Sequence, residues 1–548
     1  MRKITVCVLL VVCFATFFVN NGVLLPDIME SRNIITAREM VYDGHWIVPT
    51  MNGDLRLEKP PLPTWLAAVA EMASPDDIVL QRVMAGLAAV MLVFFFYRFS
   101  EKILKVNALV ATLLLCSCYN IILMGRTASW DIYCHAFMMG GIYCMARAMT
   151  LPRCSVWRFC AAGLFVGLSL MSKGPVSLYA LFLPFLLAFL PVCRPQMGGK
   201  AGGVALMALV AIVVGTWWYA YIYAFHAGEL TYVVNKETGA WVGHNVRPWY
   251  YYWKFFLETG VWSLLLLTAL LLPAFKADCR RRGYMFSIAW TLCVLVLLSL
   301  LPEKKSRYLL PLLIPASYTM TFLIERWQAV LANASTSETS RGGRLCADKW
   351  LFRINVWLIA ATVVALSVAA YMFVYAKGWA PLWAYVAFTV SCVLFALYLI
   401  YTSVALRPRM MVYGVAALFV MAEAFALPYV RGIIVNQERK SIALTRQDKR
   451  LAPLDFYHSA GDPLRIEMVY AAHKNIRPLD FSDKAAVLPK LPCAVLTHKR
   501  VGEELPATLW NDIDTTYIDR YDDNRYPEGH RRHSDMFVYN ITVLTEKK

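Results

Sequence analysis

The sequence contains few charged residues for a chain of its length. Of its 548 residues, 17% are Asp, Glu, Lys or Arg, whereas 59% are hydrophobic. A soluble protein of several domains needs more charge on its surface than this. The composition therefore excludes that class and indicates a protein that crosses a membrane several times.

Several motifs of soluble enzymes are also missing. The sequence has no P-loop, no dinucleotide-binding fingerprint and no recognisable nucleophile triad. The fourteen cysteines form no CxxC pair and no regular framework, so we interpret them as small buried side chains and not as disulfides or metal ligands. Internal repeats, and the inverted pairs of broken helices that many transporters have, are absent as well.

The formal net charge of +17 has an explanation that needs no nucleic acid. Lys and Arg gather in short connections between apolar runs, as they do on the cytoplasmic side of membrane proteins. We therefore expect no nucleic-acid partner. Some of these charges are suited to anionic lipid head groups, so membrane lipids are expected partners.

About thirteen apolar runs have the length and composition of membrane spans. The first follows Arg2 and Lys3 and has no small-residue cleavage site after it, which favours a permanent anchor over a signal peptide. The expected spans are residues 4–25, 78–98, 106–125, 131–149, 158–171, 174–193, 201–225, 254–275, 284–301, 308–325, 354–376, 380–402 and 409–430. The pattern predicts an α-helical polytopic membrane protein.

The distribution of charge assigns the two sides of the membrane. The amino terminus and alternate short connections carry the Lys and Arg residues, so we place them in the cytoplasm. An odd number of spans then puts the carboxyl terminus on the opposite side. The connections expected on that outer side are residues 25–77, 126–131, 172–174, 226–252 and 302–307.

The composition changes near residue 432. Residues 1–431 hold the apolar runs and are expected to form the membrane domain, with residues 25–77 and 226–252 as its large outer loops. Residues 432–548 are polar and predict a small α/β domain on the outer side. Short β-like runs occur in it at residues 465–471, 493–498 and 536–544.

Residues 28–41 of the first outer loop are expected to form a helix along the membrane surface. At 100° per residue, its aliphatic residues share one face, and Arg32 and Glu39 point the other way. Glu30 falls on the apolar face, where a carboxylate needs a partner or a function. It is either a structural carboxylate in a salt bridge or a functional group that faces the protein.

The end of the first outer loop offers a cation. Two prolines follow Glu58 and Lys59 and fix an extended backbone before an apolar helix at residues 63–73. A lysine held at the membrane interface in this way suits an anionic phosphate. The alternative is a lysine that extends along apolar surface to reach water. Glu58 and His244 could bind a divalent cation, although they lack the spacing of a metal site.

Other outer connections also carry charged residues. Asp131 stands at the mouth of a span, either as a functional carboxylate or as the cap of a helix. Lys173 lies in a very short connection, and Arg307 is one of three cations in EKKSRY. A run of this kind is usually a solvated basic edge. Cations from several outer connections nevertheless predict a rim that binds phosphate, and we include Arg32 and Arg247 among its candidates.

Several of these stretches resemble one protein family. A helix ending in ITAREM, followed by GHWIVPTMNGDLRLEKPPLPTW, resembles the bacterial 4-amino-4-deoxy-L-arabinose transferases that act on lipid A. The same superfamily contains the protein O-mannosyltransferases. Over about residues 20–325, four later stretches resemble landmarks of the family in the same order, namely GRTASWD, MSKGP, RPWYYY and EKKSRYLLPLLIP.

The resemblance implies roles for the matching residues. Glu30 matches the Glu of an Asp-Glu pair in the family's first loop, and Asp131 matches the Asp of its second loop. Lys59 stands at the lysine of the EKPP block, and Lys173 stands at a lysine that contacts phosphate. Arg307-Tyr308 matches the Arg-Tyr pair of the RYLLP block.

The sequence departs from the family pattern at two places. Met29 stands where the family has the Asp of its first-loop pair, and the nearest carboxylate is Asp27, two residues earlier. Asp27 therefore joins Glu30 and Asp131 as a candidate catalytic residue. The family's histidine-rich signature is degenerate at residues 235–237. These departures affect what is expected of the donor, the acceptor and the activity.

The resemblance implies a C-type glycosyltransferase fold and an inverting transfer of sugar from undecaprenyl phosphate. The cations would stabilise the charge of the leaving phosphate, and the carboxylates would orient or deprotonate the acceptor. The expected donor sugar is 4-amino-4-deoxy-L-arabinose and the expected acceptor is lipid A. The family further implies the periplasmic face of a bacterial inner membrane and a link to polymyxin resistance.

Two alternatives remain open. One is a protein O-mannosyltransferase-like enzyme, or another polyprenyl-phosphate-sugar transferase with a different acceptor. The other is a non-enzymatic flippase or channel, which would need polar residues in mid-span, and the sequence has few besides His135 and Glu423. We expect no required cofactor, leave a divalent metal open, and expect a monomer.

Overall fold

The computed structural model describes residues 2–243, 245–334 and 343–547. They form two compact units. The first unit consists of residues 1–21, 57–63 and 79–429, and the second of residues 22–56, 64–78 and 430–548. Most of the expected first outer loop thus belongs to the same unit as the polar carboxyl-terminal part. A domain boundary at residue 431 stays a prediction.

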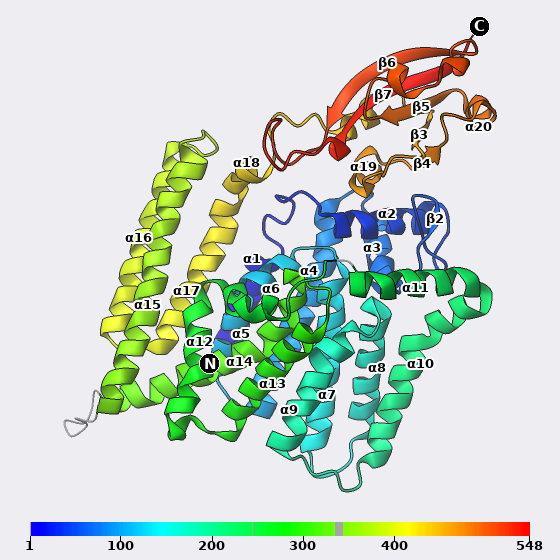
Figure 1. Ribbon diagram of the computed structural model, residues 1–548. Coiled ribbons are helices and arrows are strands. Elements are labelled where there is room, and N and C mark those ends of the chain that lie inside the picture. The colour runs from blue at the N-terminus through cyan, green and yellow to red at the C-terminus, as the bar shows by residue number, and fades with distance from the viewer. Residues whose placement is uncertain (1, 244, 335–342, 548) are drawn as a thin grey trace. The chain divides into compact units, whose positions relative to one another are not determined.

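The first unit is a bundle of helices (Figure 1). Apolar runs of this length fold as helices because, in lipid, every backbone N–H and C=O must find its partner inside the segment. The α-helices are α1 (Arg2–Phe17), α4 (Ile78–Phe99), α5 (Ala108–Cys116), α6 (Tyr119–Gly125), α7 (Trp130–Thr150), α8 (Val156–Lys173), α9 (Leu183–Cys193), α10 (Ala201–Phe225), α11 (Ala227–Gly243), α12 (Ser263–Phe275), α13 (Arg282–Leu300), α14 (Leu310–Ala334), α15 (Gly343–Ala370), α16 (Leu382–Val404) and α17 (Pro408–Met421).

Short π-helical or 3₁₀-helical segments extend several of these helices. They are η1 (Ser100–Leu104), η2 (Leu178–Phe182), η3 (Trp249–Trp262), η4 (Ala277–Cys279), η5 (Ser306–Leu309), η6 (Tyr371–Tyr375), η7 (Ala422–Ala426) and η8 (Leu427–Val430). The aromatic run at residues 249–253 begins η3. Trp249, Tyr250 and Trp253 are exposed there, as expected of side chains at the level of lipid head groups.

Nine helices of the described chain are long and apolar enough to cross a membrane, or ten if the bent pair α5 and α6 is one span. Every expected span falls on a helix, so the helical polytopic fold class is confirmed. The expected number of about thirteen is higher than this count. Two expected spans form helices of fewer than 18 residues, α1 and Leu178–Cys193. A third is α7, which is not among the nine and carries Asp131 and His135 near its start.

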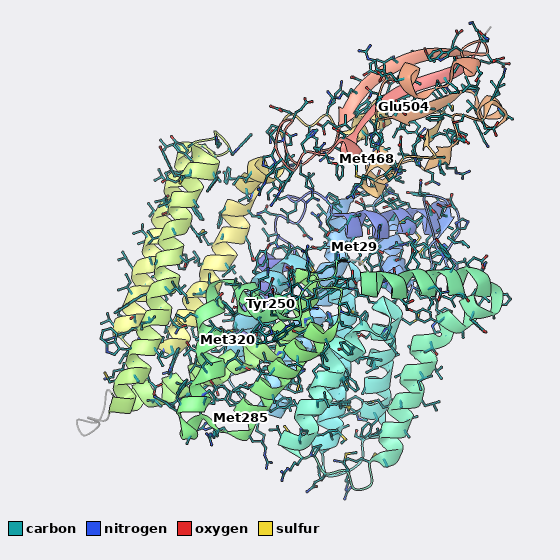
Figure 2. The ribbon with its side chains drawn as sticks, in the orientation of Figure 1. Met29, Tyr250, Met285, Met320, Met468 and Glu504 are labelled. Atoms are coloured by element: carbon teal, nitrogen blue, oxygen red, sulfur yellow. The ribbon has the colours of Figure 1, made fainter. Side chains whose placement is uncertain are left out.

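α14 lies at the centre of the bundle. In an apolar 18-residue stretch of the span Ser306–Leu331, 83% of the residues are buried, against 22% in the corresponding stretch of α16 at the periphery. Tyr318 of α14 stacks on Phe96 of α4 with ring centroids 4.2 Å apart, and Met320 of the same helix is fully buried (Figure 2). The exposed side chains of α16 are mostly apolar, as expected of a helix that faces lipid.

The helical pair α5 and α6 is bent by 72° just before the site. The break lies at Ser117 and Cys118, whose side chains donate to carbonyls of the preceding turn. The indole N–H of Trp262 donates to the Ser117 hydroxyl at 2.8 Å, so the break has a partner inside the bundle. Polar side chains that bond back to the helix are a recognised cause of such bends.

Arg126 fixes the turn that follows α6. Its buried guanidinium donates to three backbone carbonyls at the end of α1, at 2.6 to 2.8 Å, and these belong to Ala15, Thr16 and Val19. Because the last carbonyls of a helix have no partner within it, an arginine is a suitable cap. The cap holds the turn from which α7 starts, and thereby the position of Asp131.

The second unit contains a mixed five-stranded sheet of strand order β4-β3-β5-β7-β6. β4, β3 and β5 are parallel, and β7 pairs antiparallel with β5 and β6. The strands are β3 (Asp455–Ser459), β4 (Ile476–Leu479), β5 (Cys493–Thr497), β6 (Ile513–Asp522) and β7 (Val538–Glu546). The helices of the carboxyl-terminal part are α18 (Arg431–Ile434), η9 (Ile442–Gln447), α19 (Ile466–Ala472), α20 (Lys484–Val487), η10 (Leu488–Lys490), α21 (Val501–Glu504), η11 (Ala507–Leu509) and η12 (Asp535–Phe537).

The amino-terminal part of this unit adds α2 (Ile28–Tyr42), the short hairpin β1 (Thr50–Met51) and β2 (Asp54–Leu55), and α3 (Leu62–Ala73). Ile35 of α2 packs into the same apolar core as Phe456 of β3 and Val469 of α19. The predicted helices at residues 28–41 and 63–73 are confirmed.

The predicted strands of the carboxyl-terminal part have mixed outcomes. Those at residues 493–498 and 536–544 are confirmed as β5 and β7. The strand at residues 465–471 is wrong, because this segment forms α19, whose buried residues recur at helical spacing. The strands β3, β4 and β6 were not expected, and β4 is hard to recognise because it has four residues and contains Pro478.

Candidate active site

Asp27 and Glu30 form a capping box at the start of α2. Asp27 Oδ1 accepts the backbone N–H groups of Met29 and Glu30, both at 2.8 Å, and Glu30 Oε2 accepts the N–H of Asp27 at 3.2 Å. Both carboxylates therefore have a structural role in the second unit. Met29, in the place of the family's Asp, is labelled on α2 in Figure 2. Catalytic roles for Asp27 and Glu30 stay predictions.

The two faces of α2 differ in part from the expectation. Glu30 is buried and Arg32 is exposed, as expected, but Glu39 is buried instead of facing water. The loop after α2 covers Glu39, whose carboxylate accepts the N–H of Gly53 at 3.2 Å. Burial raises the pKa of Glu39, and its hydrogen bonds oppose that shift.

Asp131 and Lys173 form a buried ion pair in the first unit. Lys173 Nζ contacts Asp131 Oδ1, and the two side chains are 6% and 2% exposed. The helix cap of α7 is Ser129, so the alternative of Asp131 as the cap is wrong. Lys173 ends α8, and the next residue, Gly174, has φ +68° and lies against the Tyr219 hydroxyl. A side chain there would be strained and crowded, which explains the glycine of MSKGP.

Arg307 and Tyr308 lie beside this ion pair. Lys173 Nζ lies 5.2 Å from the centre of the Tyr308 ring, and the Arg307 guanidinium lies 5.7 Å from it. Asp131 is within electrostatic range of Arg307 and of His135. The structure thus brings together three of the expected outer connections: the turn before α7, the short connection after α8 and the segment before α14.

Lys59 reaches a different acidic partner. Its Nζ donates to Glu237 Oε2 of α11 at 3.1 Å, and the two side chains are 24% and 34% exposed. Glu237 is within electrostatic range of the Tyr219 hydroxyl, which lies against Gly174. Lys59 is therefore connected to the neighbourhood of Lys173 through Glu237 and Tyr219.

The expected outer connection that contains Arg247 pairs directly with the segment before α14. Val246 and Glu303 form an antiparallel bridge, and the backbone N–H of Arg247 donates to the carbonyl of Pro302 at 3.2 Å. Lys304 Nζ donates to the carbonyl of Arg247. The backbone of Arg247 is thereby held at the segment that leads to Arg307, while its side chain is exposed.

The expected metal ligands remain untested. Glu58 Oε1 lies 3.9 Å from Lys236 Nζ, and His244 lies outside the described residues. Within the described part of the chain, one other group could hold a metal ion: Glu39, Asp43 and His45, with ligand atoms within 4.8 Å of one another. Two of these three are exposed, and exposed acidic groups are common without a metal. A metal requirement stays a prediction.

Sequence reasoning did not select two residues of this site. His135 is named only as a polar residue in mid-span, although it follows Asp131 by four residues and so shares its helix face. Tyr219 gives no signal, because one tyrosine among the aromatic residues of an apolar helix is not distinctive. Spacing along a helix reveals the first residue, and only packing reveals the second.

Known proteins resemble this chain over part or all of its length. Residues 58–219 match the family described as dolichyl-phosphate-mannose-protein mannosyltransferase. An undecaprenyl phosphate-alpha-4-amino-4-deoxy-L-arabinose arabinosyl transferase of Pseudomonas fluorescens is 24% identical over 350 residues, which are 58% of this chain and 57% of that protein. One from Pectobacterium carotovorum is 26% identical over 363 residues, 63% of this chain and 60% of that protein. The chain thus covers less than two thirds of the length of these relatives.

Two solved structures have the same fold. ArnT from Cupriavidus metallidurans, bound to undecaprenyl phosphate, aligns over 99% of this chain and 97% of its own, with a TM-score of 0.64 and 16% identity. The apo oligosaccharyltransferase of Archaeoglobus fulgidus aligns over 90% of this chain and 69% of its own, with a TM-score of 0.52 and 10% identity. The resemblance inferred from the sequence is confirmed: the chain is similar to the aminoarabinose transferases and, over residues 58–219, to the protein mannosyltransferase family, and it has the C-type glycosyltransferase fold.

Proposed function

We propose that the protein is an inverting glycosyltransferase that takes a sugar from a polyprenyl phosphate. The observation that carries this proposal is the buried Asp131–Lys173 pair, packed on Tyr308 with Arg307 beside it. A carboxylate for the acceptor and cations for a phosphate then meet at the ends of three helices. The names of the similar proteins support the same class of reaction.

The reaction is a direct displacement at the anomeric carbon of the sugar. The leaving group is the polyprenyl phosphate, whose charge grows as the bond to the sugar breaks. Lys173 and Arg307 are placed to stabilise that charge in a site that is largely buried, where such an effect is strongest. Lys59 is a third phosphate-binding candidate at the edge of the site, and it can bind phosphate when its ion pair with Glu237 is broken.

The finer assignment follows the relatives. We propose undecaprenyl phosphate as the carrier, 4-amino-4-deoxy-L-arabinose as the sugar and lipid A as the acceptor, because the curated relatives carry the first two in their names. The reaction then takes place on the periplasmic face of a bacterial inner membrane and contributes to polymyxin resistance. The mannosyltransferase family that matches residues 58–219 makes mannose the second candidate sugar.

The test is transfer by the purified protein. Polyprenyl phosphates that carry aminoarabinose or mannose, with a labelled sugar, are incubated with lipid A and the protein in detergent. In parallel, lipid A from cells with and without the protein is compared by mass spectrometry. We expect one sugar increment that depends on the protein and is lost in Lys173→Ala. No transfer from either donor, or full transfer by Lys173→Ala, contradicts the proposal.

A further inference from the structure

Tyr252 is a buried tyrosine that the proposed mechanism does not use. It belongs to the aromatic run at the start of η3, in which Trp249, Tyr250 and Trp253 are exposed. Tyr252 is only 1% exposed. Its exposed neighbour Tyr250 is labelled in Figure 2. A belt of aromatic residues at the membrane surface explains the exposed side chains, but not a tyrosine whose hydroxyl is buried.

The hydroxyl of Tyr252 is bonded to both backbone groups of one residue. Tyr252 Oη donates to the carbonyl of Lys305 at 3.1 Å and accepts the N–H of Lys305 at 3.0 Å. Lys305 has φ −133° and ψ 143°, which is extended backbone. In this conformation the N–H and C=O of a residue point to the same side of the chain, as they do at the edge of a β-strand, so one hydroxyl can bond both. Tyr252 therefore holds Lys305 as a neighbouring strand would.

The rest of the segment between α13 and η5 is held in a similar way. Asn120 of α6 is 2% exposed, and its Nδ2 donates to the carbonyl of Ser306 at 3.2 Å. At the other end of the segment, the carbonyl of Pro302 accepts the N–H of Arg247 at 3.2 Å. Bonds from α6, from η3 and from the connection before η3 thus fix the backbone of this segment.

The segment leads directly to two residues of the candidate site. Arg307 and Tyr308 follow Ser306 in η5. Lys173 Nζ lies 5.2 Å from the centre of the Tyr308 ring, and Arg307 is within electrostatic range of Asp131. The backbone of a residue determines where its side chain can reach, so bonds made one and two residues earlier restrict the positions of the guanidinium.

We propose that Tyr252 is a positioning residue, whose hydroxyl holds the backbone of Lys305 so that Arg307 faces the phosphate that leaves the sugar. This inference rests on the proposed glycosyltransferase function and adds a residue to it. The phosphate gains negative charge as its bond to the anomeric carbon breaks, and a cation stabilises this charge best when it is already in place. Without the hydroxyl, the two backbone groups of Lys305 lose their partner and Arg307 moves away from that position.

The first test compares two tyrosine hydroxyls in the full-length protein. Tyr252→Phe removes the buried hydroxyl and keeps the ring, and Tyr250→Phe makes the same change at an exposed position of the same run. We expect Tyr252→Phe to lower kcat about tenfold while the KM of the polyprenyl-phosphate sugar changes by less than about twofold. Tyr250→Phe should keep the wild-type values. Wild-type kcat in Tyr252→Phe, with or without a change in KM, overturns the proposal.

The second test is a double variant, which separates positioning from stability. If Tyr252 acts through Arg307, the loss of its hydroxyl has little effect once Arg307 is absent. We expect Arg307→Ala to lower kcat on the order of 10²-fold, and Tyr252→Phe to lower it by less than about twofold more in that background. A tyrosine that acts only on stability would cause the same tenfold loss in both backgrounds, and this result contradicts the positioning role.

The third test needs no sugar donor. Hydrogen exchange is measured in peptides that contain the amide of Lys305. We expect this amide to exchange about tenfold faster in Tyr252→Phe than in the wild type, and at the wild-type rate in Tyr250→Phe. Equal exchange in all three proteins overturns the inference whatever the activity. Absence of any transfer by the wild type, with faster exchange in Tyr252→Phe, overturns the proposed function and the catalytic part of the inference, but not the hydrogen bonds to Lys305.

Discussion

Two carboxylates of this protein, Asp131 in the first unit and Asp76 in the second, are both paired with cations but differ in how completely they are bonded. Asp76 contacts Arg38 through Oδ1, and Arg446 and His473 through Oδ2 at 3.0 and 2.5 Å. Asp131 has one ion-pair partner, Lys173, and among the described residues nothing donates to its Oδ2.

We infer that the difference separates a structural ion pair from a functional one. Asp76 joins the segment after α3 to the carboxyl-terminal part of its own unit, and every bond it makes stabilises that arrangement. Asp131 is more deeply buried and yet keeps one oxygen free of protein partners, an arrangement that has a cost in stability and is usual at sites of chemistry. The predictions below test this contrast, beginning with the largest effect.

Removal of either partner of the buried pair should have the largest effect. We expect Asp131→Asn and Lys173→Ala each to lower the rate of sugar transfer on the order of 10²- to 10³-fold. The first change removes the carboxylate that contacts the acceptor, and the second removes a cation that contacts the phosphate. The measurement is kcat with labelled polyprenyl-phosphate sugar, at equal amounts of folded protein.

A double variant controls for stability, since one unpaired buried charge can cost about 3–5 kcal/mol. Asp131→Leu combined with Lys173→Met removes both charges and should restore thermal stability without restoring transfer. Activity in the double variant would show that the pair is structural, like that of Asp76, and would remove the contrast.

The half-exposed pair Lys59–Glu237 should give a smaller and asymmetric effect. Lys59→Ala removes a phosphate-binding candidate, so we expect transfer to fall about tenfold, equal to about 1.4 kcal/mol of transition-state stabilisation. Glu237→Ala releases Lys59 and should leave transfer unchanged or raise it. Initial rates over a range of donor concentrations distinguish the two variants, and equal losses in both would mean that the ion pair matters only for structure.

The cluster around Asp76 should affect stability and its pH dependence, but not the chemistry. Burial alone would raise the pKa of Asp76, but the hydrogen bond from His473 and the charges of Arg38 and Arg446 lower it below the ordinary value of 3.8. A carboxylate whose pKa is lower in the folded state stabilises that state above the unfolded pKa. This stabilisation is lost as the pH falls through the folded pKa.

Asp76→Asn should therefore destabilise the second unit by about 1–3 kcal/mol at neutral pH, and the difference from the wild type should begin to shrink near about pH 4 and vanish only below the folded pKa of Asp76. Hydrogen exchange in α19, measured at several pH values, reports on this unit. A difference that persists unchanged in acid would exclude the Asp76 carboxylate as its source.

Chelation of metal ions should have the smallest effect on sugar transfer. We expect no required cofactor, so transfer in the presence of EDTA should match transfer without it. The matched measurement adds Mg²⁺, Mn²⁺ or Zn²⁺ after chelation. A loss in EDTA that one of these metals restores would place a metal ion in the reaction and direct attention to Glu58 and His244.

Local sequence determined a good part of this structure. The helices at residues 28–41 and 63–73 follow from capping residues, prolines and apolar periodicity, which are all short-range signals. The same signals fail at α19, where a run of apolar residues fits either a strand or a helix, and at β4, which is too short to show a period.

By itself, the sequence determined that the chain is a helical membrane protein, that its unusual polar residues lie in one set of connections, and which family it resembles. These properties depend on composition and on spacing within single segments. The tertiary structure alone decided that Lys173 pairs with Asp131 while Lys59 pairs with Glu237. Such pairings join residues far apart in the chain, and they depend on how whole helices pack, which no local pattern encodes.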